Sequence, residues 1–436
     1  MFKNRVVKNS LMLVSEKVFR LVVGIFVNAL VARYLAPELF GQLNLFVTWL
    51  SIITVVSVLG TAGIVVREIN VGVNQREIKT LLASTFYLRL AFMSFGFLFV
   101  YLLILPDLDA YLYLIAISFL LTHLFSIIDA HQQATSAMGI VVLSNFIAFV
   151  VSSGMKLLLV YYGLGLNWFF AAFAMEMLVT SIIKIVLFVK IYHYFPFQWR
   201  YFDTQKSKQL CLMGLPLLFT SLGSLLFKQL DKIMLGAMDS MASVGIYSAA
   251  SRISESLYFI PVAISTAAFA YVATGKTISH TEYQRRLSLL FCAITLISFS
   301  SALFFTFTAD IVIGLMYGEK YLGSAQILVI HCWTGIFLGF AISSGMALNM
   351  EKLLRFSVIR VAIGLSANFI LNLLLIDKYG TLGAAYSTLI SVFIAFLLCD
   401  LFNKKLYKFF VMKIKSFNFP MLFAFFINEF LTSRKK

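Results

Sequence analysis

The sequence predicts an all-α integral membrane protein with about twelve transmembrane helices. Of its 436 residues, 61% are hydrophobic and only 12% are charged, which is typical of a polytopic helical membrane protein. Successive apolar runs are long enough to cross the roughly 30 Å hydrocarbon layer of a bilayer. The basic residues concentrate in alternate connections between these runs. These features exclude a soluble globular domain and a disordered chain.

The predicted spans form two sets of six. The first set covers 10–34, 42–66, 81–105, 111–133, 140–161 and 167–191, and the second covers 210–236, 244–272, 287–308, 322–348, 354–376 and 381–402. The longest polar connection separates the two sets. We therefore predict a domain order of an N-terminal six-helix bundle at 1–192, a cytoplasmic linker at 193–209, a C-terminal six-helix bundle at 210–403, and a basic cytoplasmic tail at 404–436.

The lysines and arginines predict the orientation of the chain. Short connections rich in these residues stay in the cytoplasm. The connections on one side contain Lys3, Arg5, Lys8, Arg67, Arg76, Lys79, Lys190, Arg200, Lys206, Lys208, Lys276, Arg285, Arg286, Lys352, Arg355 and the bases of the tail. The other side contains Arg33, Lys232, Lys320 and Lys378. Both termini are therefore predicted to be cytoplasmic, and the net charge of +16 indicates topology rather than a nucleic-acid partner.

An apolar stretch at 417–431 lies within the basic tail. It is short and contains Asn418 and Pro420, which favours a helix in the membrane interface over a thirteenth span. A thirteenth span would also carry the basic C-terminus outside. The tail is therefore predicted to stay on the cytoplasmic side.

Internal similarity predicts that the two halves are repeats. The segment Arg33–Gly41 lies between the first two spans, as Gly236–Gly245 lies between the seventh and eighth. A second similarity pairs Tyr162–Gly165 with Tyr379–Gly383. Because six spans is an even number, both halves enter the membrane in the same direction. The expected relation is a pseudo-twofold axis along the membrane normal, with a central cavity between the two bundles.

Motifs for enzymatic chemistry are missing from the sequence. Gly275-Lys276-Thr277 resembles the end of a phosphate-binding loop, but Ala270 stands where that motif needs glycine. The histidines and cysteines lack metal-binding spacing, and the outer connections are too short to hold a catalytic apparatus. We predict no enzyme activity, no cofactor and no metal. Gly335-x-x-x-Gly339 predicts a close contact between two helices.

Charged residues inside the predicted spans form the candidate site. A full charge near the bilayer centre costs about 3 kcal/mol, so these side chains are not expected to face lipid. Two interpretations remain open for each one, an ion pair between helices or the lining of a polar passage. The deepest bases are Lys17, Arg20, Lys156, Lys228 and Arg252, and the acids are Glu16, Glu176, Asp231 and Glu255. Arg89, Lys184 and Arg360 stand near cytoplasmic helix ends, where we expect them to reach the surface.

The excess of deep bases predicts a site for an anion. Glu16 and Arg20 are four residues apart, which neutralises part of the charge locally. The remaining guanidinium and ammonium groups suit phosphate, because guanidinium binds phosphate with two parallel hydrogen bonds. The substrate-binding candidates are Arg20, Lys17, Lys156, Lys228 and Arg252. The candidates for ion coupling or charge pairing are Glu16, Asp231 and Glu255.

Several longer segments together resemble one family of membrane transporters. They are Val31–Gly41 (VARYLAPELFG), Leu230–Leu235 (LDKIML), Val244–Glu255 (VGIYSAASRISE), Met316–Tyr321 (MYGEKY) and Asn372–Tyr386 (NLLLIDKYGTLGAAY). In these segments the chain resembles the Wzx-type polysaccharide flippases of the multidrug/oligosaccharidyl-lipid/polysaccharide exporter superfamily. Such proteins share the fold of the multidrug exporters of that superfamily. Arg252 and Glu255 are the positions where the resemblance best implies a functional role.

The resemblance implies a function. A flippase of this kind moves an undecaprenyl-diphosphate-linked oligosaccharide, such as an O-antigen repeat unit of lipopolysaccharide, from the inner to the outer leaflet of the bacterial cell inner membrane. Alternating access of the two halves would present the head group first to one side and then to the other. The implied partners are this lipid, the bilayer, a proton or sodium counter-ion, and polysaccharide polymerase and chain-length proteins.

Three other functions remain as alternatives. A drug or cation antiporter of the same superfamily predicts an acidic cavity, whereas the bases outnumber the acids here. A peptidoglycan-precursor flippase has closely related substrate chemistry but belongs to proteins with more spans. A membrane enzyme of glycan assembly represents a different class of function. The sequence leaves the sugar and the coupling ion open.

Overall fold

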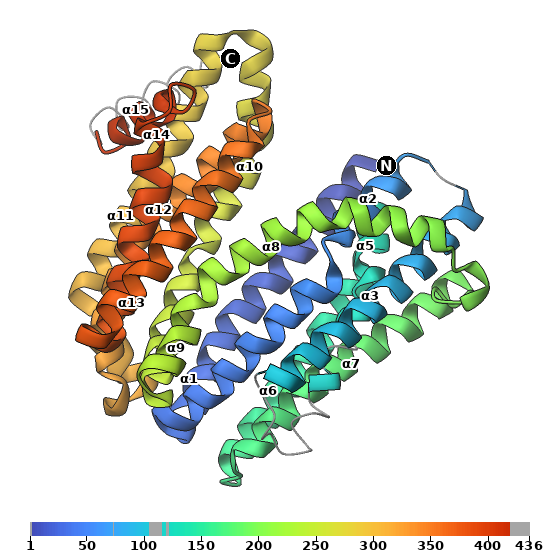
Figure 1. The fold of residues 1–436 in the computed structure, drawn as a ribbon, viewed down its shortest axis with the longest axis horizontal. Coiled ribbons are helices and arrows are strands. Elements are labelled where there is room, and N and C mark those ends of the chain that lie inside the picture. The colour runs from blue at the N-terminus through green and yellow to red at the C-terminus, as the bar shows by residue number, and fades with distance from the viewer. Residues whose placement is uncertain (1, 73, 104–115, 119–121, 419–436) are drawn as a thin grey trace. The chain divides into compact units, whose positions relative to one another are not determined.

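The computed structural model describes residues 2–72, 74–103, 116–118 and 122–418, and these ranges are helical and contain no strand (Figure 1). The helices are α1 (Phe2–Val58), α2 (Thr61–Asn70), α3 (Gln75–Leu103), α5 (Ile127–Ala134), α6 (Gly139–Tyr161), α7 (Leu166–Tyr192), η1 (Trp199–Tyr201), α8 (Thr204–Met238), α9 (Met241–Leu257), α10 (Phe259–Ile278), α11 (His280–Tyr317), η2 (Glu319–Tyr321), α12 (Gly323–Met350), α13 (Leu354–Phe393), η3 (Ile394–Leu398), α14 (Cys399–Leu401) and α15 (Tyr407–Lys415). The predicted all-α membrane class is confirmed.

Nine stretches of helix in the described ranges are long and apolar enough to cross a membrane. Two of them, Val14–Asn70 and Leu354–Leu401, each contain two of the predicted spans. The predicted span at 111–133 lies partly outside the described residues, as does the predicted interfacial helix at 417–431. The nine stretches are therefore consistent with about twelve spans.

Two sharp bends separate predicted spans within continuous stretches of helix. In α1, Ala36 leaves the helical conformation (φ 59°, ψ 171°) directly before Pro37. Proline restricts the preceding residue away from helical dihedrals and lacks a backbone donor, so the helix is interrupted here. In α13 the bend is at Gly380 (φ 55°), where the absence of a Cβ atom permits a positive φ. Both bends lie between spans that the sequence separates.

Two predicted spans are interrupted in a way that the sequence analysis missed. The predicted span 42–66 breaks after α1, where Leu59 and Gly60 both have positive φ. A Cβ atom on Gly60 would lie 2.5 Å from Cβ of Leu217, so glycine lets α8 approach closely. The predicted span 244–272 divides at Tyr258 into α9 and α10.

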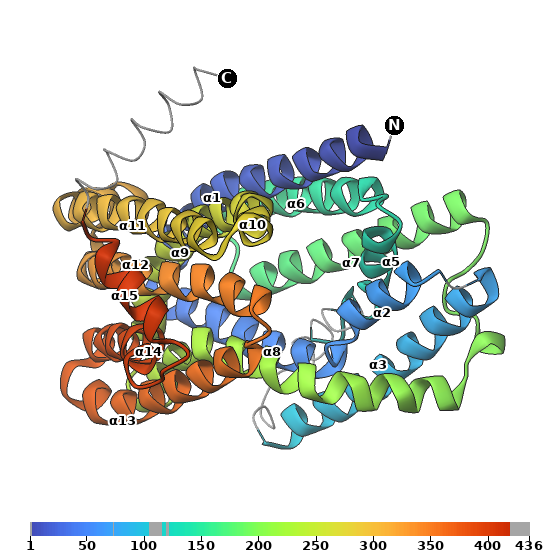
Figure 2. The same cartoon turned by 90° about the horizontal axis from the view of Figure 1, so that it is seen from above.

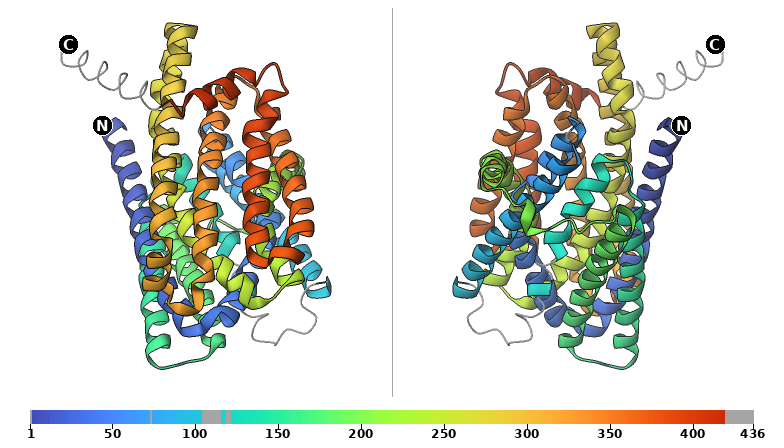
Figure 3. Two further views of the ribbon diagram at one scale, coloured as in Figure 1. Left: turned by 90° about the vertical axis from the view of Figure 1, so that its left-hand side faces the viewer. Right: turned by 90° about the vertical axis from the view of Figure 1, so that its right-hand side faces the viewer.

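The chain forms two compact units, which we call unit 1 (Met1–Leu226) and unit 2 (Phe227–Lys436). In unit 1, α1 packs on α3, α6 and α7, and α2 packs on α5 (Figure 2). In unit 2, α12 packs on α9, α10, α11 and α13, and the left view of Figure 3 shows its yellow, orange and red helices. The buried core of unit 2 centres on Leu287, Phe291 and Phe340.

The division between the units falls inside α8, rather than in the predicted linker at 193–209. That segment is itself packed on unit 1. Phe197 is buried and stacks on Phe86, with ring centroids 4.2 Å apart, and the last residues of the segment already belong to α8. The predicted domain boundaries and the twofold relation of the halves stay predictions.

The expectation that Arg89, Lys184 and Arg360 reach the surface is wrong, because neighbouring helices supply partners for them inside the protein. Arg89 is fully buried and donates to Thr61 Oγ1 at 2.9 Å and Ser126 Oγ at 3.0 Å. Lys184 forms an ion pair of 2.9 Å with Asp129. Arg360 is 2% exposed and is paired within unit 2.

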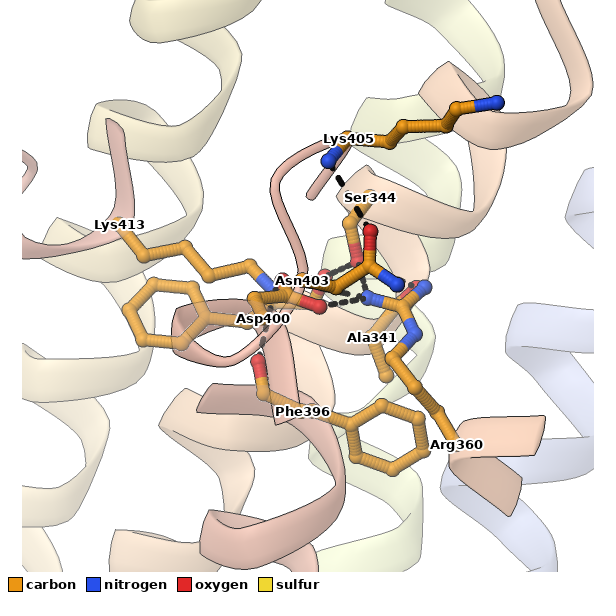
Figure 4. A network of polar contacts seen from close by, with 9 residues as sticks. Ala341, Ser344, Arg360, Phe396, Asp400, Asn403, Lys405 and Lys413 are labelled. Atoms are coloured by element: carbon orange, nitrogen blue, oxygen red, sulfur yellow. Dashed lines mark hydrogen bonds and ion pairs between the residues drawn. The ribbon is translucent and has the colours of Figure 1, made fainter. Parts of the chain in front are cut away.

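Asp400 joins Arg360 to the terminal helix of the described chain (Figure 4). Its Oδ1 accepts from Arg360 Nη1 at 3.1 Å, and its Oδ2 accepts from Lys413 Nζ at 2.6 Å. Lys413 lies on α15, and its ammonium also donates to the carbonyl of Phe396 at 2.6 Å. Burial lowers the pKa of Lys413 to about 8, although Asp400 opposes the shift. The carboxylate therefore holds α15 against the body of unit 2.

Removing the charge of Asp400 should destabilise the protein strongly. Asp400→Asn leaves two buried cations without a counter-charge, and breaking a buried ion pair costs about 3–5 kcal/mol. Thermal unfolding of the purified protein in detergent measures this loss. Glu351→Gln, which breaks the more exposed pair with Lys408, is the matched control and should cost clearly less. Equal effects of the two variants would contradict the anchoring role of Asp400.

The predicted close contact at Gly335 and Gly339 is confirmed. A Cβ atom on Gly339 would lie 2.6 Å from Cγ2 of the buried Ile294 on α11, and one on Gly335 would lie 3.1 Å from Cε1 of Tyr258. The two glycines therefore let α12 approach its neighbours closely.

Gly339→Ala should lower the free energy of unfolding by about 1–3 kcal/mol, because the added methyl group overfills a packed interface. Gly154→Ala on α6 is the control, since a Cβ atom there meets nothing within 4 Å. Denaturation of both variants in the same detergent tests the prediction. A Gly339 variant as stable as the Gly154 variant would refute it.

Candidate functional site

Three helices of unit 1 bring together a network of charged side chains. Arg20 on α1 donates from Nη2 to Glu176 Oε1 on α7 at 3.2 Å. Lys156 on α6 donates from Nζ to Glu176 Oε2, also at 3.2 Å, and Ser152 donates to the same oxygen at 2.8 Å. Arg20 also pairs with Glu16 one turn earlier, at 3.5 Å. Both oxygens of Glu176 therefore hold cations from different helices.

The unit 1 network is balanced in charge and only partly enclosed. The Glu176 side chain is 9% exposed, whereas the Arg20 side chain is 35% exposed. The rings of Phe149 and Phe173 lie 5.3 Å from the Arg20 guanidinium and 5.9 Å from the Lys156 ammonium. Two cations meet two carboxylates here, so the predicted excess of positive charge is absent from this network. The guanidinium remains the charged group that an incoming ligand can reach.

A second polar network, in unit 2, surrounds the buried carboxylate of Asp231. Asn368 and Asn372 on α13 donate to its Oδ1 at 3.1 and 2.8 Å. Tyr247 on α9 and Thr388 donate hydroxyl hydrogen bonds to its Oδ2. Asp231 is 3% exposed, and these four donors are all neutral. The carboxylate is therefore stabilised by hydrogen bonding without an ion pair to any of these partners.

The Asp231 network has two features that suit the exchange of a small cation. His331 on α12 lies 3.0 Å from the Tyr247 hydroxyl, so a chain of titratable groups leads from the histidine to the carboxylate. The Oδ1 atom of Asn372 is buried and has no hydrogen-bond partner, which leaves an unused oxygen beside Asp231. Within the described ranges, no group of three or more His, Cys, Asp and Glu side chains is placed to hold a metal ion. A proton or a monovalent cation fits this chemistry better than a multivalent metal.

The remaining predicted site residues do not join either network. Lys17 is exposed on α1, and Lys228 and Arg252 are exposed on α8 and α9. Glu255 lies 3.9 Å from Lys232 and is 41% exposed at its side chain. These residues are available to solvent or ligand, whereas Arg20, Lys156, Glu16 and Asp231 are already engaged with protein partners.

Sequence reasoning missed several members of the two networks. Glu176 was recognised as an acid within a span, but its role as the shared partner of two cations needs the helix packing. Asn368 and Asn372 have a signal of their own, since two amides four residues apart interrupt an otherwise apolar span. His331 has no metal-binding spacing to single it out in the sequence, and only the structure shows that it is buried within α12 beside Tyr247.

Comparison with known proteins agrees with this membrane fold. A solved structure of the lipid II flippase MurJ in an inward closed conformation aligns with a TM-score of 0.71 and 17% identity, covering 96% of this chain and 92% of that one. An inward-facing multidrug resistance MATE family transporter of the MOP superfamily aligns with a TM-score of 0.63 and 14% identity, covering 91% and 94%. At these identities the likeness establishes the fold.

Sequence comparison identifies the family. A probable low-salt glycan biosynthesis flippase of Haloferax volcanii is 24% identical over 178 residues, which are 39% of this chain and 37% of that protein. The matches cover less than half of the length of such curated relatives. The family model described as "Polysaccharide biosynthesis protein" matches residues 6–276, more than half of the chain. The chain is thus a multi-pass membrane protein that belongs to the polysaccharide biosynthesis protein family.

Proposed function

We propose that this protein is a flippase that carries an undecaprenyl-diphosphate-linked oligosaccharide, such as an O-antigen repeat unit, from the inner to the outer leaflet. Family membership supports a role with a lipid-linked glycan. Each sugar hydroxyl costs about 4–8 kcal/mol to transfer into hydrocarbon, so such a head group does not cross a bilayer unaided. A polar route inside a protein removes this barrier while the polyprenyl tail stays in lipid.

The observation that carries the proposal is the sharing of Glu176 between Arg20 and Lys156. Each cation donates one hydrogen bond of 3.2 Å to this carboxylate inside membrane-spanning helices. An unpaired charge in that environment costs about 3 kcal/mol, so the cations stay on Glu176 until another anion replaces it. A diphosphate offers more oxygens than a carboxylate and can accept from both cations together.

Glu176 also gives the site a means of binding and release. When the diphosphate displaces the Glu176 carboxylate, Arg20 and Lys156 bind the diphosphate. When the carboxylate regains the two cations, the internal ion pairs are restored and the head group is released. Because the guanidinium is the most exposed group of the network, the diphosphate meets Arg20 first.

Exposed bases of each unit are further candidates for binding the head group in the proposal. Lys17, Lys228 and Arg252 attract the anionic head group without having to break an internal ion pair first. Glu255 lies three residues after Arg252 and limits the charge there. In alternating access, the two halves move and present the head group outward.

Asp231 is the proposed coupling site for the counter-ion. A buried carboxylate held by neutral donors can exchange a proton or a sodium ion without disrupting an ion pair. The movement of one charge through 100 mV supplies about 2.3 kcal/mol. Glu16 and Glu255 are the other candidates for this role, but each already has a cationic partner.

The cellular setting belongs to the same proposal. The distribution of basic residues supports a cytoplasmic position for both termini, and the resemblance to the polysaccharide flippases implies the inner membrane of a bacterium. The product in the outer leaflet is the substrate that a polysaccharide polymerase and chain-length proteins would use. The protein moves this lipid without changing its covalent bonds, so we propose a transporter and no enzyme.

Variants of Arg20 and Glu176 test the proposed diphosphate site. Arg20→Gln should weaken binding of the lipid-linked oligosaccharide about tenfold to a hundredfold, because a charge-assisted hydrogen bond is lost. Arg20→Lys should bind the lipid less tightly than the unchanged protein but more tightly than Arg20→Gln. It keeps the positive charge but loses the planar guanidinium group with its parallel donors. Glu176→Gln should bind the lipid more tightly but release it slowly.

Proteoliposomes provide the measurement for these variants, with the oligosaccharide detected by an impermeant reagent on the far side. Asp129→Asn is the matched control, because it breaks a partly buried ion pair with Lys184 in the same unit. The control should lose stability but keep its transport rate per folded molecule. Unchanged binding and transport in both Arg20 variants would exclude Arg20 from the site.

Asp231→Asn should uncouple transport from the ion gradient. The amide keeps the size of the side chain but cannot exchange a proton or hold a cation by charge. The rate should therefore stop responding to an imposed proton or sodium gradient, and separate gradients identify the ion. Asp377→Asn, at an exposed carboxylate on α13, the helix that carries Asn368 and Asn372, should retain the response. If transport by Asp231→Asn still depends fully on the ion gradient, Asp231 is not the coupling site.

A further inference from the structure

A basic pocket lies in unit 1, apart from both networks described above. It is formed between the first two turns of α3 and the segment that joins η1 to α8, and it has a volume of about 710 Å³. The residues that line it are Gln75, Arg76, Lys79, Thr80, Arg200, Tyr201, Phe202 and Asp203. By the distribution of basic residues, both segments belong to the predicted cytoplasmic face.

The pocket carries an excess of positive charge. Arg76, Lys79 and Arg200 contribute three cations, and none of them forms an ion pair with a carboxylate in the described part of the chain. Asp203 is the one acidic lining residue, and its Oδ1 accepts from the backbone N–H of Lys206 at 3.0 Å. The Asp203 carboxylate therefore caps the start of α8 and does not act as a counter-ion to the three bases.

The walls of the pocket are held in place by packing. The Lys79 ammonium lies 4.6 Å from the ring centroid of Tyr194 and 5.6 Å from that of Tyr201. The Arg200 guanidinium lies 4.8 Å from the same Tyr201 ring. The Asp203 backbone N–H donates to Ser84 Oγ on α3 at 3.0 Å, which ties the two sides of the pocket together. Lys79 and Arg200 are thus positioned before any ligand arrives.

Aromatic side chains beside the pocket indicate where its ligand comes from. Trp199 is 66% exposed and Phe195 is 44% exposed. Trp199 stacks on Phe202 at 4.9 Å, and Tyr87 packs edge-on against Trp199 at 4.7 Å. Exposed tryptophan and aromatic clusters of this kind lie at the level of lipid head groups in membrane proteins. The aromatic side chains beside the pocket therefore suit a position at the level of the lipid head groups.

We propose that this pocket binds the phosphate of an anionic glycerophospholipid in the leaflet that faces it. Arg76, Lys79 and Arg200 would surround the phosphodiester, and Gln75 and Thr80 would donate hydrogen bonds to its oxygens or to the glycerol head. Basic pockets at the cytoplasmic ends of transmembrane helices have the chemistry for such head groups. A bound lipid would clamp the start of α3 to the segment before α8. This inference does not depend on the identity of the transported lipid.

The test compares lipids added to the purified full-length protein in detergent. Phosphatidylglycerol should raise the midpoint of thermal unfolding and remain bound in native mass spectrometry, whereas phosphatidylcholine should do neither. The triple variant R76Q/K79Q/R200Q should lose the shift and bind phosphatidylglycerol about a hundredfold more weakly, since each base near an anionic surface contributes about fivefold.

A matched triple variant separates the pocket from general surface charge. K208Q/K404Q/K405Q removes the same charge from exposed lysines of the predicted cytoplasmic face and should keep the lipid-dependent shift. The proposal would be overturned if both triple variants lost the lipid-dependent rise in the unfolding midpoint equally. It would also be overturned if R76Q/K79Q/R200Q kept that rise. Glycerol phosphate and inorganic pyrophosphate are the soluble probes. Stabilisation by either of them equal to that by phosphatidylglycerol would show a site for free anions and would overturn the assignment to a lipid.

Discussion

The cost of placing a charge in hydrocarbon is the constraint on which the rest of this structure depends. A charge near the bilayer centre costs about 3 kcal/mol, so a buried charge on one helix is stabilised when another helix supplies a partner. Arg89, Lys184 and Arg360 all obtain partners inside the protein. Each of these contacts joins two helices that the hydrophobic effect alone does not hold together within lipid. The same contacts give each helix pair a specific alignment.

The two main polar networks satisfy this constraint in different ways, and the difference bears on function. In unit 1, Glu176 holds the cations Arg20 and Lys156, so an anion that takes the place of the carboxylate meets both cations. In unit 2, Asp231 accepts from four neutral donors. The first arrangement is suited to recognising an anionic head group, and the second is suited to exchanging a small cation.

The Arg360–Asp400–Lys413 cluster shows that buried charge also has a purely structural use. Its three charged side chains are at most 2% exposed, so a head group cannot reach them. By contrast, the guanidinium of Arg20 is accessible. Exposure, rather than charge alone, therefore separates a candidate binding residue from a residue that fastens α15 to unit 2.

The sequence by itself determined the membrane class, the positions of most helices, and the breaks at Ala36 and Gly380. These follow from apolar length and from the local chemistry of proline and glycine, which neighbouring residues reveal. Only the tertiary structure decided which charges meet. Glu176 lies 156 positions from Arg20, and Asp231 lies 137 positions from Asn368, so no local pattern relates them. A count of bases and acids along the chain predicted a basic site, whereas helix packing paired two of those bases, Arg20 and Lys156, with carboxylates, because in lipid an available counter-charge stabilises the cation.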